Sequence, residues 1–427
     1  MSDMIKHISI ILFSFFLSVQ IVGQGNILLN HASVHVGNGE VVNDAVVGVV
    51  NGRIKFVRNA LVYTIRKKEW DTIIDLKHQN LYPGFVAPSS TLGLTEIDAV
   101  RASNDFEEIG EFNPHIRALI AYNVESTVIS TVRTNGVLLA QSSPRGGTIS
   151  GSSSVMHLGG WNWEDAVAKK DDGIHINWPR SLKRERWGER TKKANKDYRE
   201  QKAEIEAFFE AAKNYHESVS KQKTDLRFLA MQGLFTGKKR LYFHAHEIQQ
   251  MLDIIEFSKK FGIKYPVIVG GYESYLIAER LRDAGIPVMI QRVHSLPMRE
   301  DDPVDLPYRL PAILKEKGVL FCLQNEGDME AMNARNIPFL AGTAHAYGLS
   351  QEEAIRAISL DACKIMGIDE DYGSIEQGKV ATLFVSDGNA LEMKENKVTM
   401  ILMNGQFIDL NNHQLELYKK YRKKYGL

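Results

Sequence analysis

The segment that decides the fold is residues 241–290, LYFHAHEIQQMLDIIEFSKKFGIKYPVIVGGYESYLIAERLRDAGIPVMI. Its apolar runs LYFHAH, YPVIVGG and PVMI are predicted strands, and the two stretches between them have the spacing of amphipathic helices. Strands that alternate with helices indicate parallel β/α units. The segment therefore predicts two consecutive β/α units followed by a third strand.

The same alternation continues on both sides of this segment. TVIST at 127–131 and GVLLA at 136–140 are predicted strands before it, and GVLFCLQ at 318–324 is a predicted strand after it. The length of the repeated unit favours a barrel over a helical bundle or an all-β fold. We expect an α/β protein with a TIM-like (β/α)8 barrel over residues 83–375.

Both ends of the chain are rich in short strand patterns. Residues 26–75 alternate, contain many valines and include the hairpin turn Asn51–Gly52, while ATLFVS at 381–386 and VTMILM at 398–403 lie near the other end. These patterns predict a small composite β-sandwich from residues 24–82 and 376–412, with a tail at 413–427. Two unrelated hairpins are the alternative.

Charge gives no support for a nucleic-acid partner. Lysine plus arginine and aspartate plus glutamate each number 52 in 427 residues, so no net field steers the protein to nucleic acid or an anionic membrane. A charged, helix-forming insertion at about 180–223 interrupts the barrel pattern. It predicts either a contact surface for an acidic partner or a solvated helical face.

The N-terminus has the pattern of a secretory signal peptide. Lys6 and His7 precede an apolar run of about 15 residues from Ile8 to Val22, shorter than the roughly 20 that a spanning helix needs, and Gly23 follows it. We expect residues 1–23 to be removed and the protein to be exported, periplasmic or secreted, with no stable membrane anchor. A retained anchor is the alternative.

Several strings together resemble one family. They are NGRIKFV at 51–57, DTIIDLKHQNLYPGFVAPSSTLGL at 71–94, GGTISGSSSVMHLGGWNWEDA at 146–166, ARNIPFLAGTAHAYGLS at 334–350 and EEAIRAISLDACKIMGIDEDYGSIEQGKVATLFVSDG at 352–388. The chain resembles the imidazolonepropionase-like and dipeptidase-like branch of the amidohydrolase superfamily, as a divergent exported member. The resemblance implies a barrel beside a β-sandwich, metal at the carboxyl ends of the barrel strands and hydrolysis of C–N bonds.

The metal ligands that the resemblance implies are only partly present. The first barrel strand of the family carries His-x-His, whereas this sequence has Ser89 and Thr91, which are poor replacements around a transition metal. His244 and His246 on the fifth strand, with Glu326 after the eighth, remain as a predicted site for one divalent metal, most favourably zinc. Glu326 is then a ligand or the general base, and Asp328 is the alternative carboxylate at this position.

Other polar or aromatic residues near predicted strand ends are candidate site residues. His294 is a catalytic candidate for proton transfer or substrate binding, and Arg335 with Asn336 could hold a substrate carboxylate. Trp161 is a candidate substrate wall. The alternatives are a turn-capping histidine, a loop pinned to the barrel and simple packing. The glycine- and serine-rich residues 146–154 are predicted to form a flexible loop at the barrel mouth.

Two functions remain open from the sequence. One is a hydrolase of C–N bonds in a non-peptide, cyclic or dipeptide-like amide, acting on a small-molecule substrate through a reduced mononuclear metal site. The other is a catalytically inactive barrel that binds a ligand or acts as the partner of an active paralogue. The tail and the insertion could contact another subunit, either a second copy or that paralogue.

Overall fold

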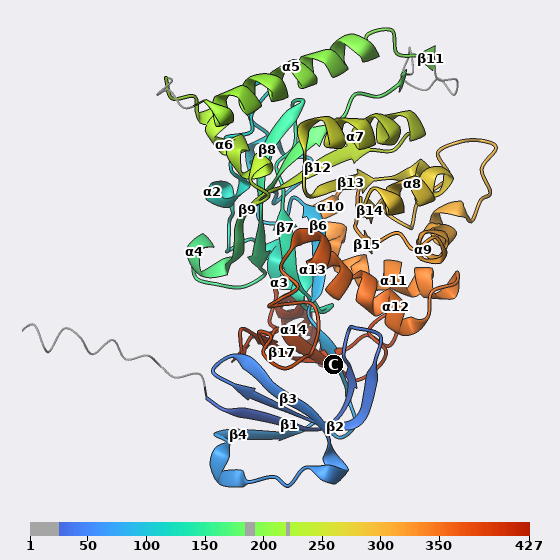
Figure 1. Ribbon diagram of the computed structural model, residues 1–427. Helices are drawn as coiled ribbons and strands as arrows, with labels where there is room; N and C mark the ends of the chain where they lie inside the picture. Colours follow the sequence, from blue (N-terminus) through green and yellow to red (C-terminus); the bar gives the residue numbers. More distant parts are fainter. Residues whose placement is uncertain (1–24, 184–192, 219–222) are drawn as a thin grey trace, which may run out of the picture.

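The computed structural model describes residues 25–183, 193–218 and 223–427. It contains a barrel and, below it in Figure 1, a separate β-sheet module. The predicted signal peptide and part of the charged insertion lie outside the described residues. In the described part of the chain, no helix is long and apolar enough to cross a membrane.

The barrel sheet has eight strands in the order β15-β14-β13-β12-β9-β8-β7-β6. The strands are β6 (Phe85–Ser90), β7 (Val137–Ser142), β8 (Ile149–His157), β9 (Val167–Asn177), β12 (Arg240–Ala245), β13 (Pro266–Gly270), β14 (Val288–Ile290) and β15 (Phe321–Leu323). Seven of them run in the same direction, and β8 is antiparallel to both of its neighbours. The predicted TIM-like barrel is confirmed, with one strand reversed.

The reversed strand corrects the prediction of a flexible mouth loop at residues 146–154. Residues 149–157 form β8, and every one of them is buried. Its serines hydrogen-bond inside the barrel wall, and Gly151 lies so close to the carbonyl of Ile116 that a side chain would not fit. A run of serine and glycine has low strand propensity, and tertiary contacts override it here.

The predicted strand at residues 127–131 is also wrong. These residues begin α3 (Thr127–Arg133), and the Ser126 side chain caps the helix by accepting a hydrogen bond from the Val128 N–H. The β-branched composition of TVIST suggested a strand, but the cap and the burial of Ile129 and Val132 on one face favour a helix.

The helices cover the outside of the barrel (Figure 1). They are α2 (Ala118–Ala121), α3, α4 (Trp163–Ala166), α5 (Tyr198–Glu217), α6 (Leu226–Phe235), α7 (Ile248–Phe261), α8 (Ala278–Asp283), α9 (Leu306–Glu316), α10 (Glu330–Asn333), α11 (Ile337–Ala346), α12 (Gln351–Ala357) and α13 (Leu360–Met366). In the insertion, Phe209 of α5 packs on Phe257 and Phe261 of α7. One face of the insertion helix is therefore part of the barrel core.

Strands from both ends of the chain form a single eight-stranded sheet. Its order is β18-β17-β16-β5-β1-β2-β3, and β4 pairs with β1. The strands are β1 (Ile27–His35), β2 (Val41–Val50), β3 (Arg53–Asn59), β4 (Thr72–Asp75), β5 (Asn80–Pro83), β16 (Leu383–Ser386), β17 (Val398–Met403) and β18 (Gln406–Phe407). Antiparallel pairing of β16 with β5 joins the two ends, which excludes two unrelated hairpins.

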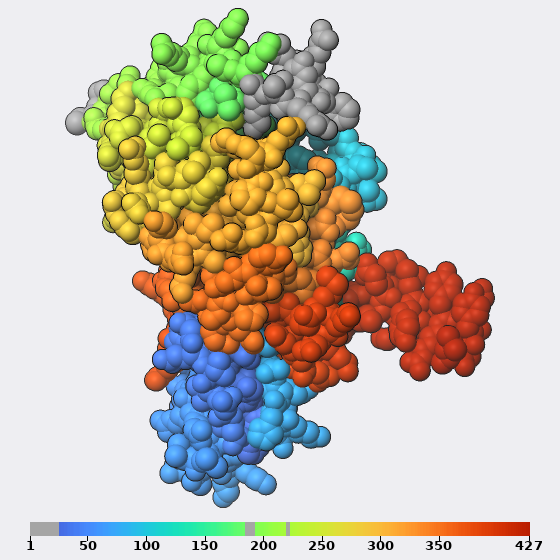
Figure 2. Space-filling model, turned by 90° about the vertical axis from the view of Figure 1, so that its right-hand side faces the viewer, coloured from blue at the N-terminus to red at the C-terminus, as the bar shows by residue number. Residues whose placement is uncertain are grey.

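The predicted tail contains α14 (His413–Tyr425), which has no buried residue. This helix projects away from the body of the molecule, as the red lobe in Figure 2 shows. Its side chains are therefore available for contacts outside the described chain.

Candidate functional site

Polar side chains from several strand ends surround one cavity of about 270 Å³. It lies at the carboxyl ends of the parallel strands, where barrels of this kind place their active sites. The cavity is lined by Ser89, Thr91, Asp98, Phe106, Arg145, His244, Val269, Gln324, Glu326, Gly327 and Glu330.

His246 and Glu326 form a direct pair beside this cavity. His246 follows β12, Glu326 follows β15, and the imidazole Nε2 lies 3.0 Å from the carboxylate Oε1. Burial raises the pKa of Glu326, but the charge and hydrogen bond of His246, together with the charges of His244 and Arg145, outweigh burial, so this pKa is lower than usual. His246 Nδ1 and Glu326 Oε2 are buried and have no hydrogen-bond partner within the described chain. Asp328, the alternative carboxylate, is exposed.

His244 faces a second histidine that the sequence analysis missed. His244 Nε2 lies 2.9 Å from Nδ1 of His175 on β9, and the His175 ring stacks on Tyr242 with a centroid distance of 4.6 Å. Burial, followed by the charge of Arg145, lowers the pKa of His244 to about 3. Burial also holds the pKa of His175 well below its usual value. Both rings are therefore neutral near pH 7, so one ring donates the hydrogen bond between them and the other accepts it.

The three predicted metal ligands do not converge on one point. Among the described residues, the one group of at least three histidine, cysteine or acidic side chains with donor atoms all within 4.8 Å of one another is His31, Asp44 and His78, in the other sheet. His244, His246 and Glu326 instead contact neighbouring side chains in separate pairs. His244, His246 and Glu326 are residue types that bind zinc, but their side chains are not arranged around one point as a zinc site requires.

Ser89 and Thr91, which replace the family's His-x-His, hold a cation and a carboxylate. Arg145 donates to the Ser89 carbonyl at 2.6 Å and to its hydroxyl at 3.3 Å. The Thr91 N–H and hydroxyl both donate to Glu330 Oε2, at 2.7 and 3.1 Å. Burial raises the pKa of Glu330, and nearby Arg145 opposes that rise. Where the family has His-x-His, this chain therefore has a charged pocket in which Ser89 fixes the guanidinium of Arg145.

A buried carboxylate lies deeper in the barrel and supports this site. Asp172 on β9 accepts hydrogen bonds from Gln141 at 2.8 Å, Ser153 at 2.7 Å and the Tyr242 hydroxyl at 2.6 Å. Gln141 in turn accepts from the Ser89 N–H at 3.0 Å. The network thus connects β7, β8, β9 and β12 to the first strand at the floor of the cavity.

The remaining predicted site residues lie away from this cavity. His294 is exposed and its Nε2 lies 2.6 Å from the Thr343 hydroxyl on α11. Arg335 is exposed, and its carbonyl accepts from Asn135 just before β7, at the opposite end of the barrel. Its neighbour Asn336 donates to the Asn333 side chain at 3.4 Å. The structure does not bring these residues to His246 and Glu326.

Trp161 lies in the connection between β8 and β9 and is 93% exposed. Because β8 is antiparallel, this connection lies at the amino end of β7, where His157 pairs with Leu139. The structure therefore places Trp161 at the opposite end of the barrel from the cavity. The prediction of Trp161 as a candidate substrate wall did not include the reversed strand.

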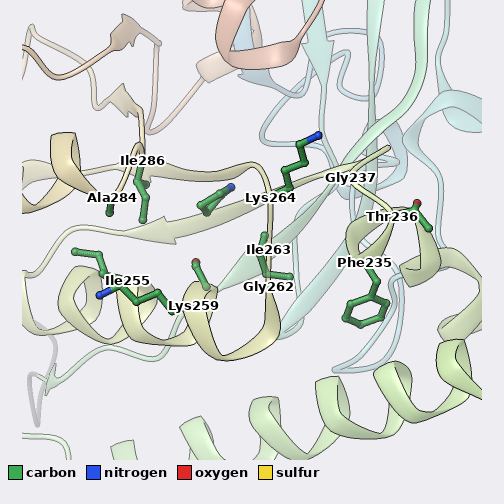
Figure 3. Close-up of a pocket in the computed structure, with 12 residues that line it drawn as sticks. Phe235, Thr236, Gly237, Ile255, Lys259, Gly262, Ile263, Lys264, Ala284 and Ile286 are labelled. Carbon is green, nitrogen blue, oxygen red and sulfur yellow. The ribbon is translucent and has the colours of Figure 1, made fainter.

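A larger cavity of about 500 Å³ has a different character (Figure 3). It is lined by residues that precede β12, β13 and β14, which places it at the amino ends of these strands. Lys259 and Lys264 are its only ionisable lining residues. It offers no acid–base pair, so the smaller cavity is the better candidate site.

Three buried histidines predict sensitivity to acid. Burial lowers the folded-state pKa of His157 to about 4, that of His244 to about 3 and that of His175 well below its usual value. The unfolded chain then binds more protons below pH ~6.5, so stability falls as pH falls. Between pH 6.5 and 5.5 we expect a loss of about 1 kcal/mol for each histidine. Urea denaturation across this pH range measures the free energy of unfolding, and a constant value would contradict the prediction.

Comparisons with known proteins agree with this fold. The amidohydrolase family model matches residues 133–411, about two thirds of the chain. An amidohydrolase from Thermotoga maritima MSB8 has 24% identity and a TM-score of 0.75, over 90% of this chain and 99% of its own. A search of curated proteins found no match.

Two further solved structures share the fold at lower similarity. A Xaa-Pro dipeptidase with bound methionine in its active site has 14% identity and a TM-score of 0.55, over 90% of this chain and 100% of its own. An adenosine deaminase from Xanthomonas campestris with bound zinc has 14% identity and a TM-score of 0.52, over 93% of this chain and 97% of its own. With the barrel, the polar cavity at its carboxyl end and the family match all in agreement, this chain belongs to the amidohydrolase family.

Proposed function

We propose that the protein hydrolyses a C–N bond in a small amide that carries a carboxylate. Membership of the amidohydrolase family indicates a hydrolase. The observation that carries the finer proposal is the contact between His246 and Glu326 beside a cavity that also contains Arg145. The dipeptidase of similar fold binds methionine, a molecule with a free carboxylate.

In this proposal Glu326 is the general base and Arg145 binds the substrate anion. The Glu326 carboxylate accepts a proton as a water oxygen attacks the amide carbon, and the proton is then transferred to the leaving nitrogen. His246 holds Glu326 in its ionised form. A guanidinium fixed by the Ser89 carbonyl suits a carboxylate because its planar fork can donate two parallel hydrogen bonds.

Zinc remains a separate part of the proposal. Binding by His244, His246 and Glu326 together would require His244 to leave its contact with His175. Bound zinc would supply an activated water and polarise the amide carbonyl. Elemental analysis of protein purified without chelators, beside a His244→Ala, His246→Ala variant, tests it. A metal content that falls by about one equivalent in the variant supports this site, and an equal metal content in the two proteins contradicts it.

A second candidate function is ligand binding without catalysis. It is favoured by the uncharged Ser89 and Thr91, since these residues hold Arg145 and Glu330 where active relatives have metal-binding imidazoles. Such a protein would bind a small carboxylate or pair with an active paralogue. The charged cavity supports this candidate even if no chemistry occurs.

Assays with N-acyl amino acids, dipeptides and cyclic amides separate the two functions. Hydrolysis supports the first candidate, and binding measured by calorimetry without hydrolysis supports the second. The absence of both hydrolysis and binding would contradict both candidates. Arg145→Lys is expected to weaken binding about tenfold to hundredfold, because a charge-assisted hydrogen bond is lost. Arg335→Lys, an exposed arginine at the other end of the barrel, is the control and should leave binding unchanged.

A further inference from the structure

A second group of metal-ligating side chains lies in the β-sheet module, away from the barrel cavity. His31 on β1, Asp44 on β2 and His78 in the turn before β5 offer donor atoms that all lie within 4.8 Å of one another. His31 Nδ1 lies 2.7 Å from Asp44 Oδ1, and His78 Nδ1 lies 3.8 Å from the same oxygen. The three side chains are partly exposed, so a water molecule can reach them.

Two β-bulges bring His31 and Asp44 together. On β1, Asn30 and His31 lie opposite the single residue Val46, and on β2, Asn43 and Asp44 lie opposite Ser33. His31 and Asp44 have φ values of 53° and 48°. A bulge re-aims the side chain of its extra residue, and here both extra residues are aimed at each other.

The third ligand is fixed to the first through the backbone. The His78 N–H donates to the His31 carbonyl at 2.7 Å, and His78 also has a positive φ, of 65°. The two imidazole rings are tilted, with centroids 5.7 Å apart. Three non-glycine residues in the left-handed region are thus held at one point, and their side chains are two imidazoles and one carboxylate.

We propose that His31, Asp44 and His78 bind a divalent transition-metal ion, with water completing the coordination. Two histidines, one carboxylate and an open position match the donor count of zinc sites. A bound ion would join β1, β2 and the turn that follows β4. The site is distinct from the barrel cavity, because β6 enters the barrel from the sheet module at its amino end, whereas the cavity lies at the carboxyl ends.

The test is calorimetric titration of the chelator-treated full chain with zinc chloride. It is carried out in a His246→Asn, Glu326→Gln background, so that binding in the barrel cannot contribute. We expect one equivalent of zinc to bind and to raise the melting temperature. His78→Asn and Asp44→Asn should each weaken binding at least about tenfold and reduce the melting shift. Asparagine tolerates the left-handed backbone at these positions.

The matched control is His413→Asn, which removes an exposed histidine outside the cluster and should leave zinc binding unchanged. Circular dichroism establishes that each variant is folded. Zinc binding that His78→Asn and Asp44→Asn do not weaken would overturn the proposal, as would the absence of saturable binding to the folded parent.

Discussion

Glu326→Gln is expected to lower kcat for amide hydrolysis by about 10²–10⁴-fold, the usual contribution of a general base. Glutamine keeps the size of the side chain but cannot accept the proton of the attacking water. The Glu326 carboxylate is paired with His246 at 3.0 Å, and its second oxygen is buried without a partner among the described residues. Steady-state kinetics on the best amide from the screen measures the effect.

Asp328→Asn is the matched control, because Asp328 is an exposed carboxylate two residues further along the same segment. It should retain the parental kcat. KM should change little in Glu326→Gln, since Arg145 still binds the substrate anion. A Glu326→Gln protein with parental kcat would exclude Glu326 as the base and would favour a different catalytic group in the cavity.

Asp172→Ala is expected to lower the free energy of unfolding by about 3–5 kcal/mol. The substitution leaves three buried donors without their acceptor: the Gln141 amide, the Ser153 hydroxyl and the Tyr242 hydroxyl. Each unsatisfied buried donor costs about 1–3 kcal/mol, and partial rearrangement reduces the sum. Urea denaturation at pH 7.5 measures the change.

The control for this variant is Asp171→Asn, at the adjacent position of β9. Asp171 pairs with Arg117 at 2.9 Å near the surface and has a φ of 47°, which asparagine also adopts. Loss of this ion pair should lower the free energy of unfolding by less than about 1 kcal/mol. Equal destabilisation by the two variants would show that the buried network adds no stability beyond an ordinary surface pair.

The barrel was predictable from sequence because its strands after residue 240 are short apolar runs separated by amphipathic helices. Strand β8 was not, because ISGSSSVMH contains few residues of high strand propensity and its direction depends on pairing with β7 and β9. Helix α3 was mistaken for a strand because its β-branched residues are typical of strands. Their low helix propensity is a weak effect, and burial of one face of the helix overrides it.

The candidate site was predictable only in part. The sequence placed His246 and Glu326 at strand ends as ligands of one metal, and the structure brings these two together without His244. The loss of imidazoles at Ser89 and Thr91 followed from the family resemblance. His175, Arg145 and Glu330 were missed, although Arg145 lies three residues after the strand GVLLAQS and a basic residue just after a barrel strand is a usable indication. The reversal of β8 also explains why Trp161 lies far from the cavity, since the sequence alone does not give strand direction.

The composite sheet has a consequence for the order of folding. Strand β5 pairs with β16, which lies some 300 residues later, so the sheet module cannot be completed until almost the whole chain has been synthesised. Until then β5 is an unprotected sheet edge, a surface on which other chains can add strands. The β8–β9 hairpin closes over a short loop and has a low entropic cost, so its contacts can form early. We therefore expect folding to begin in the middle of the chain and the two ends to join last.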